Sequence, residues 1–188
     1  MQKSKLSSSM RVYNKKTIEM VNSEITNAIE NTAQLLIGNH LSLAFAESAT
    51  AGRACAEFSL ACNAGKFLKG GFVCYDATLK SSLLDVPNDL IEKYTPESME
   101  VTKAIASGLR KIIDADIHIG ITGLPCPGGS ETDEKPVGTM FIYALLHGEP
   151  WFNERLQLLG CHQDIVEQTI ICLAQRLSEY ITAQKISQ

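Results

Sequence analysis

The sequence predicts an α/β fold: one three-layer domain in which a mostly parallel or mixed sheet lies between two layers of helices. Apolar residues make up 45% of the 188 residues and charged residues 20%, a balance typical of a one-domain globular chain. Stretches with the helical spacing of apolar residues alternate with short apolar runs typical of strands. The connections between them are short, as in sheets that helices cover on both faces.

The first part of the chain contains a basic segment, a helix and a buried strand. Residues 1–16 carry five basic and no acidic side chains, and we expect them to be a flexible arm before a domain of residues 17–184. From Thr17 to Gly38, apolar residues at helical spacing predict a helix that ends at the glycine. Residues 41–45 predict a short buried strand that leads into a second helix ending near residue 62.

The middle of the chain alternates in the same way. Residues 72–75 predict a strand and residues 80–84 a helical turn, before a proline interrupts the chain. Thr95 is expected to cap a helix that runs to about Ile113, because a proline and an acidic residue follow it. Alternating isoleucines in residues 117–122 predict the next strand.

The last third contains a loop, two strands and a final helix. Residues 123–136 are too rich in glycine and proline for a helix or strand, and they predict a long loop. Residues 137–146 predict a long apolar strand at the centre of the sheet, and residues 151–159 predict one more strand. Residues 162–181 predict a closing amphipathic helix.

The charge distribution disfavours general nucleic-acid binding. Beyond residue 16 the chain carries 12 basic and 21 acidic side chains, and a body with a net charge of −9 repels phosphate backbones.

No apolar run reaches the ~18 residues of a membrane span, and the first residues lack the apolar core of a signal peptide. We therefore expect a cytoplasmic protein with no membrane partner. The six cysteines have no spacing typical of a zinc site, and we expect reduced thiols and no metal site.

Three loops lie where ligands bind in such sheets, beyond the carboxyl ends of the strands. The first follows the strand at residues 41–45 and contains Glu47, Ser48, Ala49, Thr50, Ala51 and Gly52. Its small residues let a substrate approach the backbone, and free N–H groups at a helix start suit an anion. Ser48 is a candidate nucleophile on this turn. The alternative is that Ser48 or Thr50 only caps the following helix.

Lys80 is the candidate base for Ser48, since none of the four histidines is placed for that role. A lysine acts as a base only when it is neutral, which requires an enclosed pocket that lowers its pKa from ~10.4 towards ~7. Tyr75, at the end of the preceding strand, could hold or pass a proton beside it. The alternatives are a lysine that extends into solvent and a half-buried tyrosine.

The glycine- and proline-rich loop of residues 123–136 is the third candidate. It lacks the G-x-x-x-x-G-K-[ST] pattern of a P-loop, which disfavours a nucleoside triphosphatase. It brings Thr122 and backbone groups close to the strand ends, and residues 135–139 lead back into the sheet. The alternative is a surface connection, although irregular loops of this length are often functional.

Three separated segments share their order and spacing with one known family. They are Ala46-Glu47-Ser48-Ala49-Thr50-Ala51-Gly52, then Gly70-Gly71-Phe72-Val73-Cys74-Tyr75-Asp76-Ala77-Thr78-Leu79-Lys80, then Thr122-Gly123-Leu124-Pro125-Cys126-Pro127-Gly128-Gly129 with Lys135-Pro136-Val137-Gly138-Thr139. They resemble the carboxy-terminal domain family of CinA, the competence-damage-inducible proteins, whose stand-alone members include PncC-type nicotinamide-mononucleotide amidohydrolases. The similarity covers about residues 35–182.

The resemblance implies a cytoplasmic α/β domain that forms a homo-oligomer and hydrolyses the carboxamide of nicotinamide mononucleotide to the carboxylate and ammonia. By position, it implies Ser48 as the nucleophile, Lys80 as its base and Tyr75 as an assisting hydroxyl. N–H groups in residues 49–52 would hold the oxyanion, and the loop 122–129 would hold the ribose phosphate. The implied substrate-binding residues are Glu47, Ala49, Thr50, Ala51, Gly52, Thr122, Gly123, Pro127, Gly128 and Gly129. No metal and no organic cofactor is implied.

The sequence departs from the family pattern around these implied catalytic residues. The changed positions include Ala49, Ala51, Ala77, Thr78, Pro125, Cys126 and His162. At His162 the family has an arginine, and a neutral histidine makes no bidentate phosphate contact, so we expect the change to affect nucleotide binding. Two alternatives stand beside the amidohydrolase: a module that binds a nucleotide or phosphate without turnover, and an oligomeric interaction protein.

Overall fold

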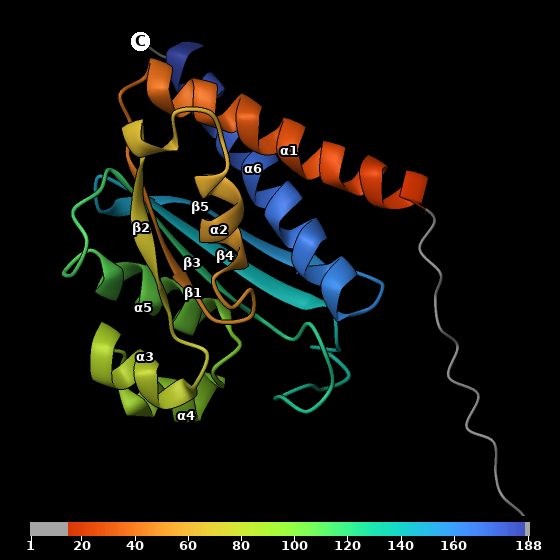
Figure 1. Cartoon of the computed structure of the whole chain (residues 1–188). Helices are drawn as coiled ribbons and strands as arrows, with labels where there is room; N and C mark the ends of the chain where they lie inside the picture. Colours follow the sequence, from red (N-terminus) through yellow and green to blue (C-terminus); the bar gives the residue numbers. More distant parts are fainter. Residues whose placement is uncertain (1–14, 187–188) are drawn as a thin grey trace, which may run out of the picture.

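The computed structural model describes the backbone of residues 15–186 and the side chains of residues 24–183. Residues 1–14 of the expected basic arm lie outside the described residues. Its last two residues, Lys15 and Lys16, belong to the first helix, α1 (Lys15–Gly38). In the described part of the chain, a five-stranded sheet lies between helices on both faces (Figure 1). This arrangement confirms the predicted three-layer α/β fold.

The sheet is mixed, with the strand order β2-β1-β3-β4-β5. Its strands are β1 (Leu43–Glu47), β2 (Leu68–Val73), β3 (Ile117–Gly123), β4 (Thr139–Leu146) and β5 (Glu149–Gln157). β1 pairs in parallel with β2 and β3, whereas β4 pairs antiparallel with β3 and β5. Because β1, β2 and β3 are parallel, their carboxyl ends lie at one edge of the sheet.

The central strand is β3, and the prediction that residues 137–146 form the centre was wrong. β4 lies between β3 and the edge strand β5. All but its last residue are nonetheless buried, because helices cover both faces of the sheet at this position. A continuous apolar run therefore indicates coverage on both faces and does not distinguish the middle strand from its neighbour.

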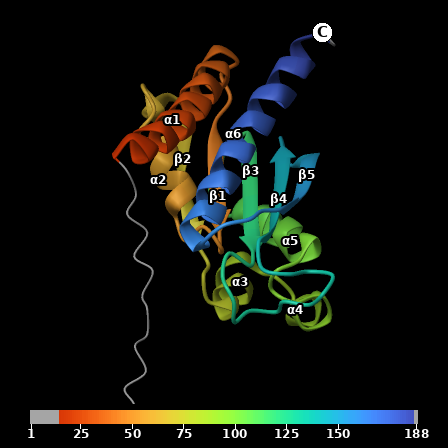
Figure 2. The same cartoon turned by 90° about the vertical axis from the view of Figure 1, so that its right-hand side faces the viewer.

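Helices lie on both sides of the sheet (Figures 1 and 2). On one side lie α1, α2 (Arg53–Ser59) and α6 (His162–Ile186); on the other lie α3 (Ala77–Leu84), α4 (Asn88–Tyr94) and α5 (Met99–Leu109). The helices α3 and α4 pack against α5. A short 3₁₀ turn (Ala64–Lys66) precedes β2.

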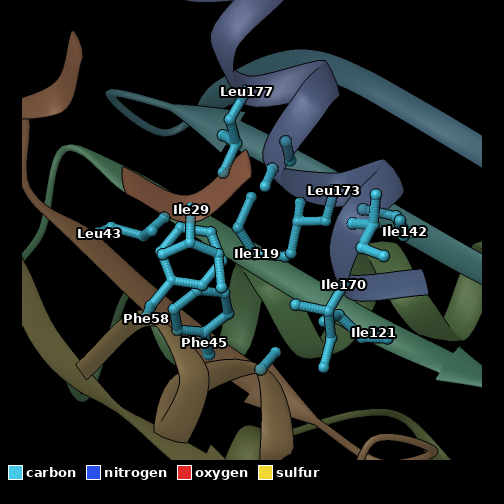
Figure 3. Packing of buried hydrophobic residues seen from close by; sticks show 14 of the residues in the cluster. Ile29, Leu43, Phe45, Phe58, Ile119, Ile121, Ile142, Ile170, Leu173 and Leu177 are labelled. Atoms are coloured by element: carbon cyan, nitrogen blue, oxygen red, sulfur yellow. The ribbon is translucent and has the colours of Figure 1, made fainter. Parts of the chain in front are cut away.

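The larger hydrophobic core lies between the sheet and the layer of α1, α2 and α6. Figure 3 shows Phe45 of β1 against Phe58 of α2, and Ile119 of β3 near Leu173 of α6. These four side chains are fully buried, and the two phenylalanine rings are 5.2 Å apart. The contact between the phenylalanine rings holds α2 against β1, the strand that precedes the loop carrying Ser48.

The segment 88–109 differs from its prediction. No helix was predicted at α4, and the helix expected to begin at Thr95 begins instead after Ser98, whose hydroxyl accepts a hydrogen bond from the Val101 N–H at 3.3 Å. Thr95 ends α4 with a φ of 69°, a positive value that a right-handed helix does not allow. The misplacement arose because threonine, proline and glutamate are as compatible with an inter-helix turn as with a helix start.

Candidate active site

The loops that follow β1, β2 and β3 surround one cavity. The cavity has a volume of about 250 Å³. It is lined by Ser48, Tyr75, Glu97 and the residues 123–129. It therefore lies at the edge of the sheet where ligands bind in open α/β folds.

Ser48 and Lys80, which are 32 residues apart in the sequence, are in contact at this cavity. The Lys80 Nζ lies 3.1 Å from the Ser48 Oγ and donates a second hydrogen bond to the Cys74 carbonyl at 3.2 Å. Ser48 is held to the sheet by its N–H, which donates to the Ile121 carbonyl at 2.9 Å. The geometry is that of a nucleophile within hydrogen-bond reach of a base.

Local structure brings the Lys80 side chain to this position. Asp76 caps α3 by accepting hydrogen bonds from the Thr78 N–H at 2.8 Å and the Thr78 hydroxyl at 2.6 Å. Lys80 follows one turn later and is only 1% exposed, so the alternative of a solvent-extended lysine does not describe it.

Burial lowers the pKa of Lys80 below the ordinary value of 10.5, against the opposing effects of Cys74, Glu97 and Asp76. Desolvation disfavours the ammonium form, because the surrounding residues replace water that would stabilise the charge. A lysine with this shift supplies more of the neutral amine, which is the form that accepts a proton from a serine.

The hydroxyls of Ser48 and Thr50 do not cap α2. The residue at the start of the helix is Gly52, with a φ of 91° and no side-chain cap of its own. The Thr50 hydroxyl donates to Glu47 Oε2 at 2.6 Å, whereas the Ser48 hydroxyl contacts Lys80. The hydroxyl-capping alternative is therefore wrong for both residues.

Glu47 holds the start of α2 in their place. Its carboxylate is 1% exposed and accepts hydrogen bonds from the N–H groups of Gly52 and Ala54, both at 3.0 Å, and of Cys55 at 2.8 Å. A negative charge at a helix N-terminus is favourable, and it satisfies N–H groups that have no partner within the helix. Glu47 does not line the cavity, so the structure gives it a role in positioning the loop and not in contacting a substrate.

The same hydrogen bonds reduce the set of oxyanion donors expected in residues 49–52. The Gly52 N–H is bonded to Glu47, and the Ala51 N–H donates to the Ser48 carbonyl at 3.1 Å. Among the hydrogen bonds of the described residues, the N–H groups of Ala49 and Thr50 have no acceptor. Of the amides expected to hold an oxyanion, these two therefore remain free to donate, although neither residue lines the cavity.

The loop after β3 contributes one wall of the cavity through residues 123–129. Gly123 has a φ of 152°, and a Cβ there would lie 2.4 Å from the Met140 Sδ and 2.7 Å from the Thr139 carbonyl oxygen. Only glycine fits this position. Pro127, Gly128 and Gly129 line the cavity as expected from their place in the loop.

Thr122 does not reach the cavity, although the sequence placed it among the binding residues. It is fully buried, and its hydroxyl lies 2.7 Å from the hydroxyl of Thr102 in α5. It joins β3 to the helix that covers it. Thr122 is the second-last residue of β3, and sequence patterns do not locate the end of a strand to within one residue.

Tyr75 also lines the cavity and is 61% exposed. Within the described part of the chain its hydroxyl has no hydrogen bond to Ser48 or Lys80, so it is positioned to meet a bound molecule and does not support the pair directly.

His162 begins α6, is exposed and does not line this cavity.

Glu97 lines the cavity although the sequence did not predict it, and so do Leu124, Pro125 and Cys126, for which no binding role was expected. Glu97 lies between α4 and α5, and no local pattern indicates that this turn faces the β3 loop. Among the described residues, no three His, Cys, Asp or Glu side chains are grouped closely enough to hold a metal ion.

Comparison with known proteins identifies the family. A family model described as the CinA C-terminal domain matches residues 25–181. The chain belongs to the CinA C-terminal domain family. This result confirms the resemblance inferred from the three sequence segments.

Relatives of this CinA domain include the CinA-like protein of Desulfotalea psychrophila, which is 37% identical over 134 residues, 71% of this chain and 32% of that protein. The CinA-like protein of Mycobacterium avium is 36% identical over 155 residues, 80% of this chain and 35% of that protein. The chain thus spans about a third of the length of the curated relatives it matches.

Solved structures of CinA superfamily proteins share the fold. The protein from Escherichia coli has a TM-score of 0.76 and 30% identity, covering 84% of this chain and 91% of that chain. The protein from Klebsiella pneumoniae 700603 has a TM-score of 0.80 over 85% of this chain and 98% of that chain, and at 24% identity this match concerns the fold alone. In the part of this CinA domain that the structure describes, no helix has the length and apolar character needed to cross a membrane.

Proposed function

We propose that this CinA domain is an amidohydrolase that converts the carboxamide of nicotinamide mononucleotide to the carboxylate and releases ammonia. The observation that carries the proposal is the contact of 3.1 Å between the Ser48 Oγ and the buried Lys80 Nζ at a ligand-sized cavity. Burial lowers the pKa of Lys80, which makes the amine a suitable base for the hydroxyl. We also propose, from the family resemblance, that the enzyme works in the cytoplasm as a homo-oligomer.

In the first half of the reaction, the Ser48 Oγ attacks the amide carbon while neutral Lys80 takes the hydroxyl proton. The carbonyl oxygen becomes an oxyanion, which the N–H groups of Ala49 and Thr50 would stabilise. The Lys80 ammonium then gives its proton to the amide nitrogen, the C–N bond breaks, and ammonia leaves. Ser48 now carries the acyl group as an ester, and Lys80 is neutral again.

In the second half, water attacks the ester carbon and Lys80 accepts a proton from that water. The tetrahedral intermediate collapses, the bond to the Ser48 Oγ breaks, and Lys80 returns the proton to the serine oxygen. The carboxylic acid that forms loses its proton to solvent and leaves as the carboxylate. Tyr75, which lines the same cavity, would donate a hydrogen bond to the substrate amide once it is bound.

The proposal is tested by incubating the purified chain with nicotinamide mononucleotide and measuring both ammonia and nicotinate mononucleotide. We expect the two products in equal amounts. The Ser48→Ala protein, purified in parallel, controls for a contaminating amidase and should release neither product. Binding of the nucleotide without any ammonia, under conditions where a known amidase is active, would contradict the proposal and support a binding module.

The rate is expected to rise with pH. Lys80 is an ammonium below its pKa and a neutral base above it, and burial places that pKa below 10.5, so the base form increases as the pH rises through the lowered value. Measuring kcat/KM from about pH 6 to about pH 10 should show a single rising limb that levels off before the pKa of an ordinary lysine. A rate that is flat or falls over this range would rule out Lys80 as the base.

A further inference from the structure

Glu97 is the one charged side chain among the described residues that line the Ser48 cavity. The other lining side chains are a serine, a tyrosine and the uncharged residues 123–129. Lys80 lies behind Ser48 and is almost completely buried, so it presents no charge to the cavity surface. A molecule that enters the cavity therefore meets a single carboxylate.

The Glu97 carboxylate is held in place by a hydrogen bond and forms no direct ion pair, although the Lys135 ammonium lies on the far side of Ser130. The Ser130 hydroxyl donates to Glu97 Oε2 at 2.5 Å. Lys135 stands behind this serine, and its Nζ contacts three other atoms: the Ser130 Oγ at 2.8 Å, the Thr95 Oγ1 at 2.5 Å and the Glu97 carbonyl oxygen at 2.9 Å. No ion pair within 4.0 Å involves the Glu97 carboxylate among those of the described residues. Its charge is oriented but not paired.

We propose that Glu97 is a specificity-determining residue, and that its carboxylate selects a carboxamide substrate whose ring carries a positive charge. This inference rests on the proposed function, because it concerns the same cavity. Because Ser48 and Glu97 line the same cavity, we expect an amide carbon at the Ser48 Oγ to place the ring that bears the amide near Glu97. A quaternary pyridinium carboxamide has its charge on that ring.

The physical basis is that the cavity removes part of the water around both groups. A carboxylate and a cation attract each other more strongly where water is partly excluded, and the same carboxylate repels an anion. A neutral ring of the same shape gains nothing from Glu97. The carboxylate therefore discriminates by the charge of the ring and not by its size.

The test compares the binding of two ligands that differ in ring charge. Nicotinamide mononucleotide has a cationic ring, whereas its 1,4-dihydro form has a neutral ring with the same carboxamide, ribose and phosphate. Dissociation constants are measured by calorimetry in the Ser48→Ala protein, which prevents turnover, with and without Glu97→Gln. Glutamine removes the charge and keeps one oxygen that can accept the Ser130 hydrogen bond, while an NH2 group replaces the other oxygen.

We expect Glu97→Gln to weaken binding of the cationic form about tenfold and to change binding of the dihydro form by less than about twofold. Glu100→Gln is the matched control, since Glu100 is an exposed carboxylate in the first turn of α5 that does not line this cavity. It should change neither constant.

Three outcomes would overturn the inference: equal weakening for both ligands, which indicates a structural role for Glu97; no weakening for either; and no binding of either ligand by the Ser48→Ala protein. The proposed function is judged separately by ammonia release from the wild-type chain. Charge-dependent binding without ammonia release would reject the amidohydrolase and leave the role of Glu97 intact.

Discussion

Lys80→Met is expected to reduce kcat for amide hydrolysis by a factor of about 10³ or more while leaving the protein folded. Methionine matches the length and burial of the lysine stem but has no amine to accept the Ser48 proton. The serine hydroxyl without a base is a weak nucleophile. The change is measured by ammonia release at saturating substrate, with circular dichroism to establish that the fold is retained.

The comparison variants make this result specific. Because Ser48 and Lys80 act as one unit, the double variant should be about as slow as either single one, Ser48→Ala or Lys80→Met. Lys66→Met is the control, since Lys66 is exposed and lies before β2, at the opposite end of that strand from the cavity. A Lys80→Met protein with the kcat of the wild type would show that another group activates Ser48.

Lys80→Met also tests the lowered pKa through stability. The pKa of Lys80 is higher in the unfolded chain than in the folded chain. At a pH between these two pKa values the unfolded chain binds this proton more strongly, which stabilises the unfolded state. As the pH rises across this window towards 10.5, the wild type should gain stability relative to Lys80→Met.

Glu47→Ala is expected to lower the free energy of unfolding by about 3 kcal/mol or more. The carboxylate accepts hydrogen bonds from the Thr50 hydroxyl and from the N–H groups of Gly52, Ala54 and Cys55. Alanine leaves these donors without an acceptor and removes the negative charge from the start of α2. Unfolding in urea, followed by circular dichroism, measures the loss.

An exposed glutamate provides the control for this change. Glu92→Ala, in α4, should alter the free energy of unfolding by less than about 0.5 kcal/mol. Glu47→Gln should lie between the two, because it keeps one acceptor oxygen but places an amide group against backbone donors. If Glu47→Ala and Glu92→Ala unfold at the same urea concentration, the carboxylate does not hold the loop.

The elements that the sequence predicted best are those with a strong local pattern. The helix ending at Gly38 and the strand at 117–122 have regular apolar spacing, which depends only on residues near each other in the chain. The turn between α4 and α5 was predicted poorly. Thr95 has a positive φ between two helices that pack against each other, and the sequence around it is also compatible with a helix start.

For the candidate site, the sequence alone determined which loops follow strand ends and which nucleophile and amine lie on them, because these are properties of short segments. Only the tertiary structure decided that Lys80 reaches Ser48, that Glu47 turns towards the amides of α2, and that Glu97 enters the cavity. Each of these contacts depends on the distance between two segments, and other parts of the chain set that distance. Such distances depend on how the sheet and its covering helices pack, and no local pattern contains them.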